Sequence, residues 1–73
     1  MATLGEERVR WTFNPSGTGL VDEFKTKTAA LIDLCEDHRR NTDDGETKRL
    51  WALAQTHFED AAMWAVKAAT IPK

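Results

Sequence analysis

The sequence has few of the residues that small proteins use to compensate for a small core. Its 73 residues include one cysteine, Cys35, and two histidines. No internal disulfide can form, and these three side chains lack the paired spacing of a structural zinc site. A chain of this length buries only about 60% of the surface that its unfolded form exposes. We therefore expect association with further copies to supply the missing stability.

Long apolar runs and charge blocks are also missing. No stretch approaches the roughly 18 apolar residues of a membrane span, and the N-terminus lacks the pattern of a signal peptide, so we expect a cytosolic protein without a membrane partner. The net charge is −2, with lysines and arginines interspersed among acidic residues. This balance disfavours binding to a nucleic-acid polymer, although two or three placed cations would still suit a small anionic ligand.

Two long segments have helical periodicity, and they predict an all-α protein. The expected helices are 20–40 and 43–70, joined by a short polar connection that favours an antiparallel hairpin. We expect Thr18 or its neighbour to cap the first helix. The second should start near Asp43 or Asp44, where Asp43 with Glu46 three residues later resembles a capping box. The buried stripe of the first helix is predicted to contain Val21, Phe24, Leu31, Ile32, Leu34 and Cys35.

The second helix carries two adjoining apolar stripes, which is more than one hairpin partner can cover. One contains Leu50, Leu53, His57, Ala61, Trp64 and Ala68. The other contains Trp51, Ala54, Phe58, Ala62, Ala65 and Ala69. We expect the second of these stripes to pack against another subunit, so that the hairpins form a homo-oligomeric helical bundle. In the alternative, a compact monomer, the segment 8–13 would fold back over part of that stripe.

The first 19 residues are predicted to form an N-terminal arm and a ligand loop within a single domain, 1–73. Residues 1–7 are polar and expected to be frayed, and the alternating pattern from Arg8 to Phe13 predicts an extended segment. The stretch 14–19 is rich in turn-forming residues. Its glycines and hydroxyl side chains, followed by a helix start, could bind a phosphate, although any turn before a helix uses the same residue types.

Three side chains could contribute to a nucleotide site. Lys27 lies in the apolar stripe of the first helix, where it could contact an anion or simply extend to water. Trp11 and Phe13 could stack on bases or pack the arm onto the helices. Together with the loop, they would suit a ligand with a base and a phosphate.

No catalytic or metal-binding arrangement is predicted. Cys35 is expected to be a buried apolar residue, and Glu59 and Asp60 are adjacent on a helix and do not face each other. We therefore expect a protein that is not an enzyme and needs no cofactor.

Several short motifs resemble one known family. The elements are Phe13-Asn14-Pro15, the two-helix hairpin, the run 50–53 and the run 58–65 with its acidic-Ala-Ala-Met-Trp-Ala pattern. They resemble the phage anti-CBASS nucleotide sponges, whose hairpin fold is shared by one class of anti-Thoeris sponges. The similarity extends over most of 9–69.

The resemblance implies a function and an assembly. Members bind cyclic oligonucleotide signals in the cytoplasm of the infected bacterium and hold them without cleavage. They form homo-hexamers, with cyclic dinucleotides between subunits and cyclic trinucleotides in a separate pocket. The base-stacking aromatic would be Phe13, beside Asn14, and the phosphate-contacting lysine would be Lys27, beside Thr28. Arg49 is the candidate for the trinucleotide pocket.

The chain departs from the family pattern at two positions. Phe13 replaces the usual tyrosine, which keeps stacking and removes a hydroxyl, and Val66 stands where an asparagine is expected. The resemblance therefore implies binding of cyclic dinucleotides more strongly than binding of cyclic trinucleotides. A protein-binding hairpin without a nucleotide ligand is the alternative function, with the wide apolar stripe as its docking face.

Overall fold

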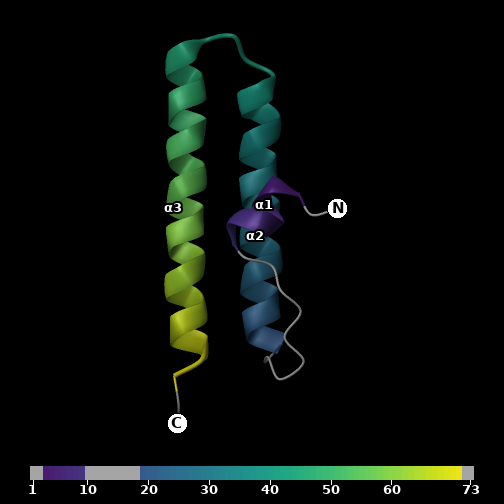
Figure 1. Ribbon diagram of the computed structural model, residues 1–73, viewed down its shortest axis with the longest axis vertical. Coiled ribbons are helices and arrows are strands. Elements are labelled where there is room, and N and C mark those ends of the chain that lie inside the picture. The colour runs from purple at the N-terminus through teal and green to yellow at the C-terminus, as the bar shows by residue number, and fades with distance from the viewer. Residues whose placement is uncertain (1–2, 10–18, 72–73) are drawn as a thin grey trace.

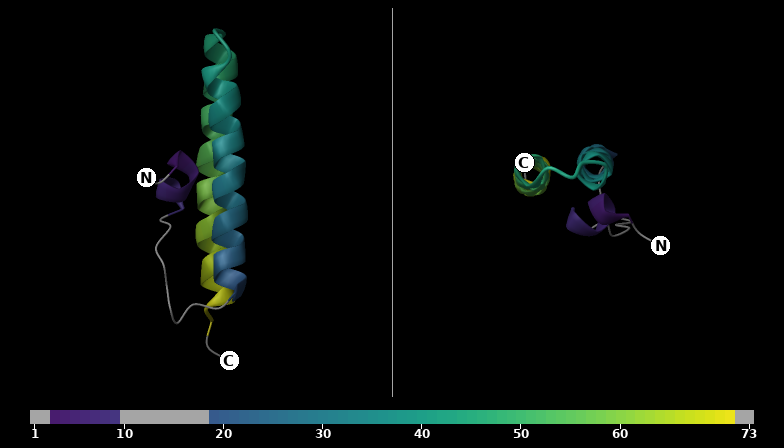
Figure 2. Two further views of the ribbon diagram at one scale, coloured as in Figure 1. Left: turned by 90° about the vertical axis from the view of Figure 1, so that its right-hand side faces the viewer. Right: turned by 90° about the horizontal axis from the view of Figure 1, so that it is seen from above.

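The computed structural model describes residues 3–9 and 19–71, and in these residues all regular structure is helical. The elements are α1 (Leu4–Arg8), α2 (Gly19–Arg40) and α3 (Gly45–Ala69). Helices α2 and α3 run antiparallel side by side, and the connection 41–44 joins them at one end (Figure 1). Helix α1 lies on one side of the plane that the two long helices define (Figure 2). The predicted helical hairpin is confirmed. Within the described residues, no helix is long and apolar enough to cross a membrane.

The ends of the long helices follow ordinary capping rules. The last turn of α2 carries His38, Arg39 and Arg40, cations that the negative end of a helix favours. Helix α3 is capped by Asp44, whose Oδ2 accepts hydrogen bonds from the Thr47 backbone N–H at 2.8 Å and from its hydroxyl at 2.6 Å. The predicted cap at Asp43 was one residue too early, because the carboxylate of Asp44 is the one that reaches the free N–H groups of the first turn. The predicted cap at Thr18 lies outside the described residues.

The N-terminal residues differ from the prediction. Residues 4–8 form the helix α1 instead of a frayed end followed by an extended segment. Thr3 caps this helix through a capping box: its Oγ1 accepts from the Glu6 N–H at 3.1 Å, and its own N–H donates to Glu6 Oε1 at 2.9 Å. Arg8 is therefore helical and Val9 ends the helix as a buried residue. The rest of the predicted extended segment and ligand loop, 10–18, lies outside the described residues.

Helix α1 is attached to both long helices. The Gly5 N–H donates to Asp33 Oδ1 of α2 at 2.7 Å, and Arg8 Nε donates to Glu59 Oε1 of α3 at 2.7 Å. A Cβ on Gly5 would lie 2.0 Å from the backbone oxygen of Ala29, so only glycine permits this approach of α1 to α2. These contacts hold α1 at a fixed place on the hairpin.

The core is small and lies where the three helices meet. Its buried cluster contains Val9, Ala29, Ile32 and Ala62, with Leu4 and Phe58 packed against it. Gln55, 2% exposed, donates from Nε2 to the Ile32 carbonyl at 3.2 Å and to Glu36 Oε1 at 3.1 Å, which satisfies its buried amide.

The two apolar stripes of α3 have exchanged roles relative to the prediction. The stripe assigned to another subunit is the one that packs inside the hairpin: Ala62 is 3% exposed, Phe58 contacts the core, and Trp51 stacks on His38 of α2 with ring centroids 5.1 Å apart. The reason is that α1 and α2 together need small residues on α3 for close approach, and the alanines of this stripe provide them.

The stripe expected inside the hairpin is exposed. Leu50, Leu53 and Trp64 are 53%, 43% and 62% exposed. On α2, the predicted buried stripe is correct for Val21, Ile32 and Cys35. It was wrong for three residues, which are at least 39% exposed: Phe24, Leu31 and Leu34.

Candidate functional site

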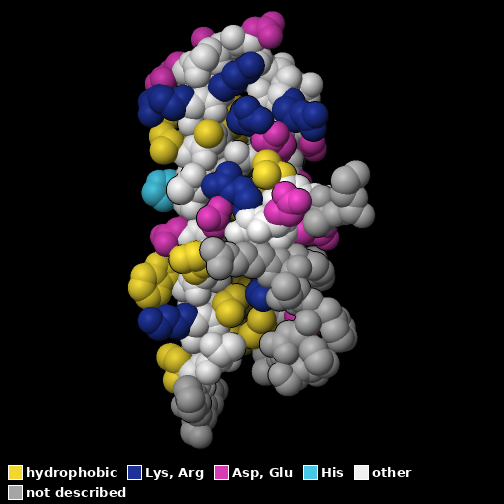
Figure 3. All heavy atoms as spheres, in the orientation of Figure 1, with side chains coloured by type: hydrophobic (Ala, Val, Ile, Leu, Met, Phe, Trp, Pro, Cys, Tyr) yellow, Lys and Arg dark blue, Asp and Glu magenta, His cyan; other side chains and the backbone are white. Residues whose placement is uncertain are grey.

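Most of the large exposed apolar side chains share one face of the hairpin, on the side away from α1. On α2, Leu31 points about 200° away from Ala29, the residue that Gly5 of α1 approaches. On α3, Ala61 points by the same angle away from Glu59, which binds Arg8. We call this surface the uncovered face. Its large side chains are Leu20, Phe24, Leu31, Leu34, Leu50, Leu53 and Trp64. The opposite face, which carries α1, has hydrophobic side chains interrupted by charged ones (Figure 3).

A cavity of about 300 Å³ lies at the edge of the uncovered face, in the first turns of α2. Its lining consists of Leu20, Glu23, Phe24 and Lys27. These positions have the spacing i, i+3, i+4 and i+7, which places them on one side of a helix. The cavity therefore combines two apolar side chains, one carboxylate and one ammonium group.

The ammonium group of Lys27 is the part of this cavity that could bind an anion. The Lys27 side chain is 72% exposed, and its Nζ lies 2.8 Å from Glu23 Oε2. The hydrogen bond and charge of Lys27 hold the pKa of Glu23 below its ordinary value. Thr28, its neighbour, is half-buried, and its hydroxyl donates to the Phe24 carbonyl at 2.6 Å, so its proton is already used within α2.

Arg49, another predicted site residue, does not lie near Lys27 within one chain. Arg49 lies in the second turn of α3, next to the connection, where its guanidinium binds Glu46 through Nε at 2.7 Å and Nη2 at 2.8 Å. Arg49 is two residues before Trp51, and Trp51 lies opposite His38 of α2. Lys27 is eleven residues before His38, or about 16 Å along α2. Within one chain, Arg49 is therefore far from Lys27. Trp11, Phe13 and Asn14 lie outside the described residues.

The structure shows an aromatic and cationic pair that sequence reasoning did not single out. Lys67 Nζ lies 5.4 Å from the ring centroid of Trp64, a cation–π distance, in the last turns of α3. Because the helices are antiparallel, this pair is at the same end of the hairpin as Lys27. The signal was present in the sequence as an aromatic and a lysine three residues apart.

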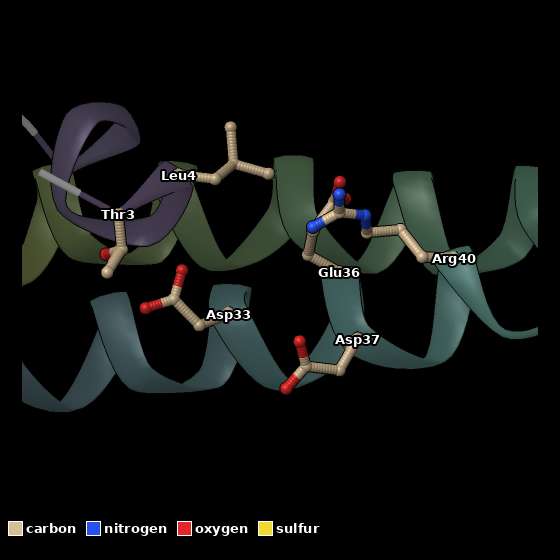
Figure 4. Close-up of a pocket in the computed structure, with 6 residues that line it drawn as sticks. All are labelled: Thr3, Leu4, Asp33, Glu36, Asp37 and Arg40. Carbon is tan, nitrogen blue, oxygen red and sulfur yellow. The ribbon is translucent and has the colours of Figure 1, made fainter.

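A second cavity, of about 380 Å³, lies between α1 and α2 and has the wrong charge for a phosphate. Figure 4 shows three carboxylates, Asp33, Glu36 and Asp37, with Arg40 extending toward Glu36. Asp33 accepts the Gly5 N–H, and Glu36 accepts from Arg39 and Gln55. Two of its three carboxylates thus hold the fold together. Residues 3–9 and 19–71 contain no group of three side chains suited to a metal ion.

Comparison with known proteins shows the family of this chain. No curated protein and no solved structure matches it. One family, described as "Acb2/Tad1, hairpin domain", matches residues 5–70, which is most of the chain. This hairpin occurs in sponge-type anti-defence proteins. The chain therefore belongs to the Acb2/Tad1 hairpin family, as the resemblance in its helical motifs had indicated.

Proposed function

We propose that this protein is a phage anti-defence sponge that binds cyclic oligonucleotide second messengers in the bacterial host cytoplasm and so blocks CBASS-type immunity. Cyclic dinucleotides are the first candidate ligands and cyclic trinucleotides the second. The observation that carries the proposal is the cavity at Lys27, in a chain of the sponge family. An ammonium group beside apolar walls suits a ligand made of flat bases and phosphates.

The position of this cavity supports a site shared between subunits. It lies at the edge of the uncovered face, where Leu20 is 48% and Phe24 39% exposed. An apolar surface of this extent on a small protein indicates a protein contact. A second copy packed on it would cover the cavity and add side chains from its own arm, for which Phe13 and Asn14 are the candidates. We propose a homo-hexamer, the assembly that the family resemblance implies.

The mechanism that we propose is sequestration without turnover. Cleavage of a phosphodiester would need a nucleophile with its base, or a metal ion. The described lining of the Lys27 cavity offers one lysine paired with one glutamate, which is suited to binding a charge. To compete with a cellular receptor, the dissociation constant should be about nanomolar, or on the order of −12 kcal/mol.

The proposal is tested by ligand retention. The protein is incubated with a substoichiometric panel of cyclic di- and trinucleotides, separated from free ligand, denatured by heat, and the released nucleotides are chromatographed. Recovery of an intact cyclic nucleotide supports the proposal. Linear products would show an enzyme, and retention of no panel member would favour the alternative, a protein-binding hairpin that uses the uncovered face.

A pair of substitutions tests the site. Lys27→Ala should weaken cyclic dinucleotide binding because it removes the charge that faces the phosphate, and Phe13→Ala should remove a stacking face worth about 1–3 kcal/mol. Lys48→Ala is the matched control, because Lys48 is an exposed lysine of α3 near the connection, away from the cavity. Titration calorimetry gives the affinities. If both site variants bind as the control does, the proposed site is wrong.

A further inference from the structure

The ion pair between Glu23 and Lys27 brings a negative charge to the only cation among the described residues that line the α2 cavity. Both side chains line that cavity, and the carboxylate lies 2.8 Å from the ammonium nitrogen. Their side chains are 55% and 72% exposed, so either can turn toward a ligand. Any anion that binds Lys27 therefore meets Glu23 at the same place.

The effect of Glu23 depends on the charge of the anion. A phosphodiester carries one negative charge, whereas a terminal phosphate monoester carries about 1.5 to 2 at pH 7. The carboxylate itself stays ionised, since Lys27 lowers its pKa. Glu23 competes with both anions for the lysine and repels the monoester more strongly. If a second subunit covers the cavity and excludes water, this difference becomes larger.

We propose that Glu23 is a specificity-determining residue, whose carboxylate makes the Lys27 cavity prefer phosphodiesters over ligands with a terminal phosphate monoester. The inference rests on the proposed function, because it takes the ligand to be a nucleotide bound at Lys27. Glu23 lowers the affinity for every anion, and it lowers the affinity for linear, phosphate-terminated nucleotides most. A sponge with this residue would keep cyclic messengers and leave their linear breakdown products in solution.

The competing explanation is that the pair only stabilises α2. Exposed pairs at this spacing contribute little to helix stability. In that case, removing the carboxylate would change stability slightly and would leave the ratio of cyclic to linear affinities as it is. Selectivity therefore separates the two explanations, and overall affinity alone does not.

The test compares Glu23→Gln with wild type by titration calorimetry. The ligands are cyclic di-GMP, cyclic di-AMP and cyclic GMP–AMP, each against the linear 5′-phosphorylated dinucleotide of the same bases. We expect Glu23→Gln to raise the affinity for the cyclic ligand by about two- to fivefold, the range of exposed ion pairs. The affinity for the linear ligand should rise more, so that the cyclic-to-linear ratio falls at least about twofold.

Asp37→Asn is the control with the same change in net charge. Asp37 is an exposed carboxylate of α2, ten residues or about 15 Å from Lys27 along the helix. This separation exceeds the Debye length of about 8 Å at physiological salt, so the control should bind both ligands as wild type does. An unchanged ratio in Glu23→Gln, or weaker binding of the cyclic ligand, would overturn the inference. If wild type binds no cyclic dinucleotide, the proposed function fails as well.

Discussion

Among single residues, Glu36 shows how the hairpin uses a half-buried carboxylate. It accepts two hydrogen bonds from the Arg39 guanidinium, at 2.8 and 2.7 Å, and a third from Gln55 at 3.1 Å. Arg39 first and Gln55 second lower the pKa of Glu36 from 4.5 to about 2. Glu36 thus connects Arg39, on the surface of α2, with the buried side-chain amide of Gln55 in α3.

This lowered pKa predicts a pH dependence of stability. A carboxylate with a lower pKa in the folded state stabilises that state above its unfolded pKa of 4.5, and the contribution is lost as pH falls toward 2. Glu36→Gln should lower the free energy of unfolding at pH 7 by about 1–2 kcal/mol. It should also make the loss of stability between pH 4.5 and 2 shallower than in wild type. Urea denaturation across this range, at fixed protein concentration, measures both effects.

Glu46→Gln is the control for this prediction. Glu46 also binds an arginine three residues later, Arg49, but the two side chains of this pair are exposed, at 62% for Glu46 and 59% for Arg49. Exposed pairs contribute little, so the loss should be smaller than for Glu36→Gln. Equal effects of the two substitutions would show that the hydrogen bond from Gln55 to Glu36 does not contribute to the stability of the fold.

Among the elements, α1 depends on one glycine for its position. Gly5→Ala would place a methyl group 2.0 Å from the Ala29 carbonyl oxygen and 2.8 Å from Asp33 Oδ1. The backbone of α2 cannot give way without breaking its own hydrogen bonds, so α1 should move off the hairpin. Overpacking of this kind costs about 1–3 kcal/mol.

Limited proteolysis checks the displacement of α1. In wild type, Arg8 is held by Glu59 at 2.7 Å and by Thr56 at 3.3 Å, which should protect the peptide bond after it from trypsin. Gly5→Ala should be cleaved there at least about tenfold faster, the factor that a loss of 1.4 kcal/mol implies. Glu7→Ala, at an exposed position of the same helix, should be cleaved at the wild-type rate. Equal rates in all three proteins would contradict the role of Gly5.

At the scale of the whole molecule, the hairpin core and the uncovered face predict two different results of adding a charge. Ala62 is 3% exposed in the hairpin core, so Ala62→Glu should unfold the chain, because an unpaired buried charge costs several kcal/mol. Leu34 is 52% exposed on the uncovered face of α2. Leu34→Glu should leave the hairpin folded and dissociate the oligomer.

Light scattering and circular dichroism separate these results. Thr26→Glu is the control, since Thr26 is an exposed residue on a different side of α2 from Leu34. We expect an oligomer for wild type and for Thr26→Glu, a helical monomer for Leu34→Glu, and loss of helix for Ala62→Glu. A wild-type monomer at micromolar concentration would contradict the assembly, whatever the variants do.

The sequence by itself determined the elements that depend on local periodicity and capping. The two long helices, the short connection and the motifs of α3 that indicate the family could all be predicted, because each depends on residues close together in the chain. It also contained the capping box of Thr3 and Glu6 that starts α1, although the alternating pattern after Arg8 led to a prediction of extended chain.

Only the tertiary structure decided which apolar stripe faces inward and what surrounds Lys27. Two adjoining stripes on α3 have similar composition, and the choice depends on how closely α1 and α2 can approach, which Gly5 and Ala62 permit. For the same reason, the sequence could name Lys27 as a candidate but not show that Glu23 pairs with it. Periodicity defines the faces of each helix, whereas their contacts are set by packing between segments that are distant in the chain.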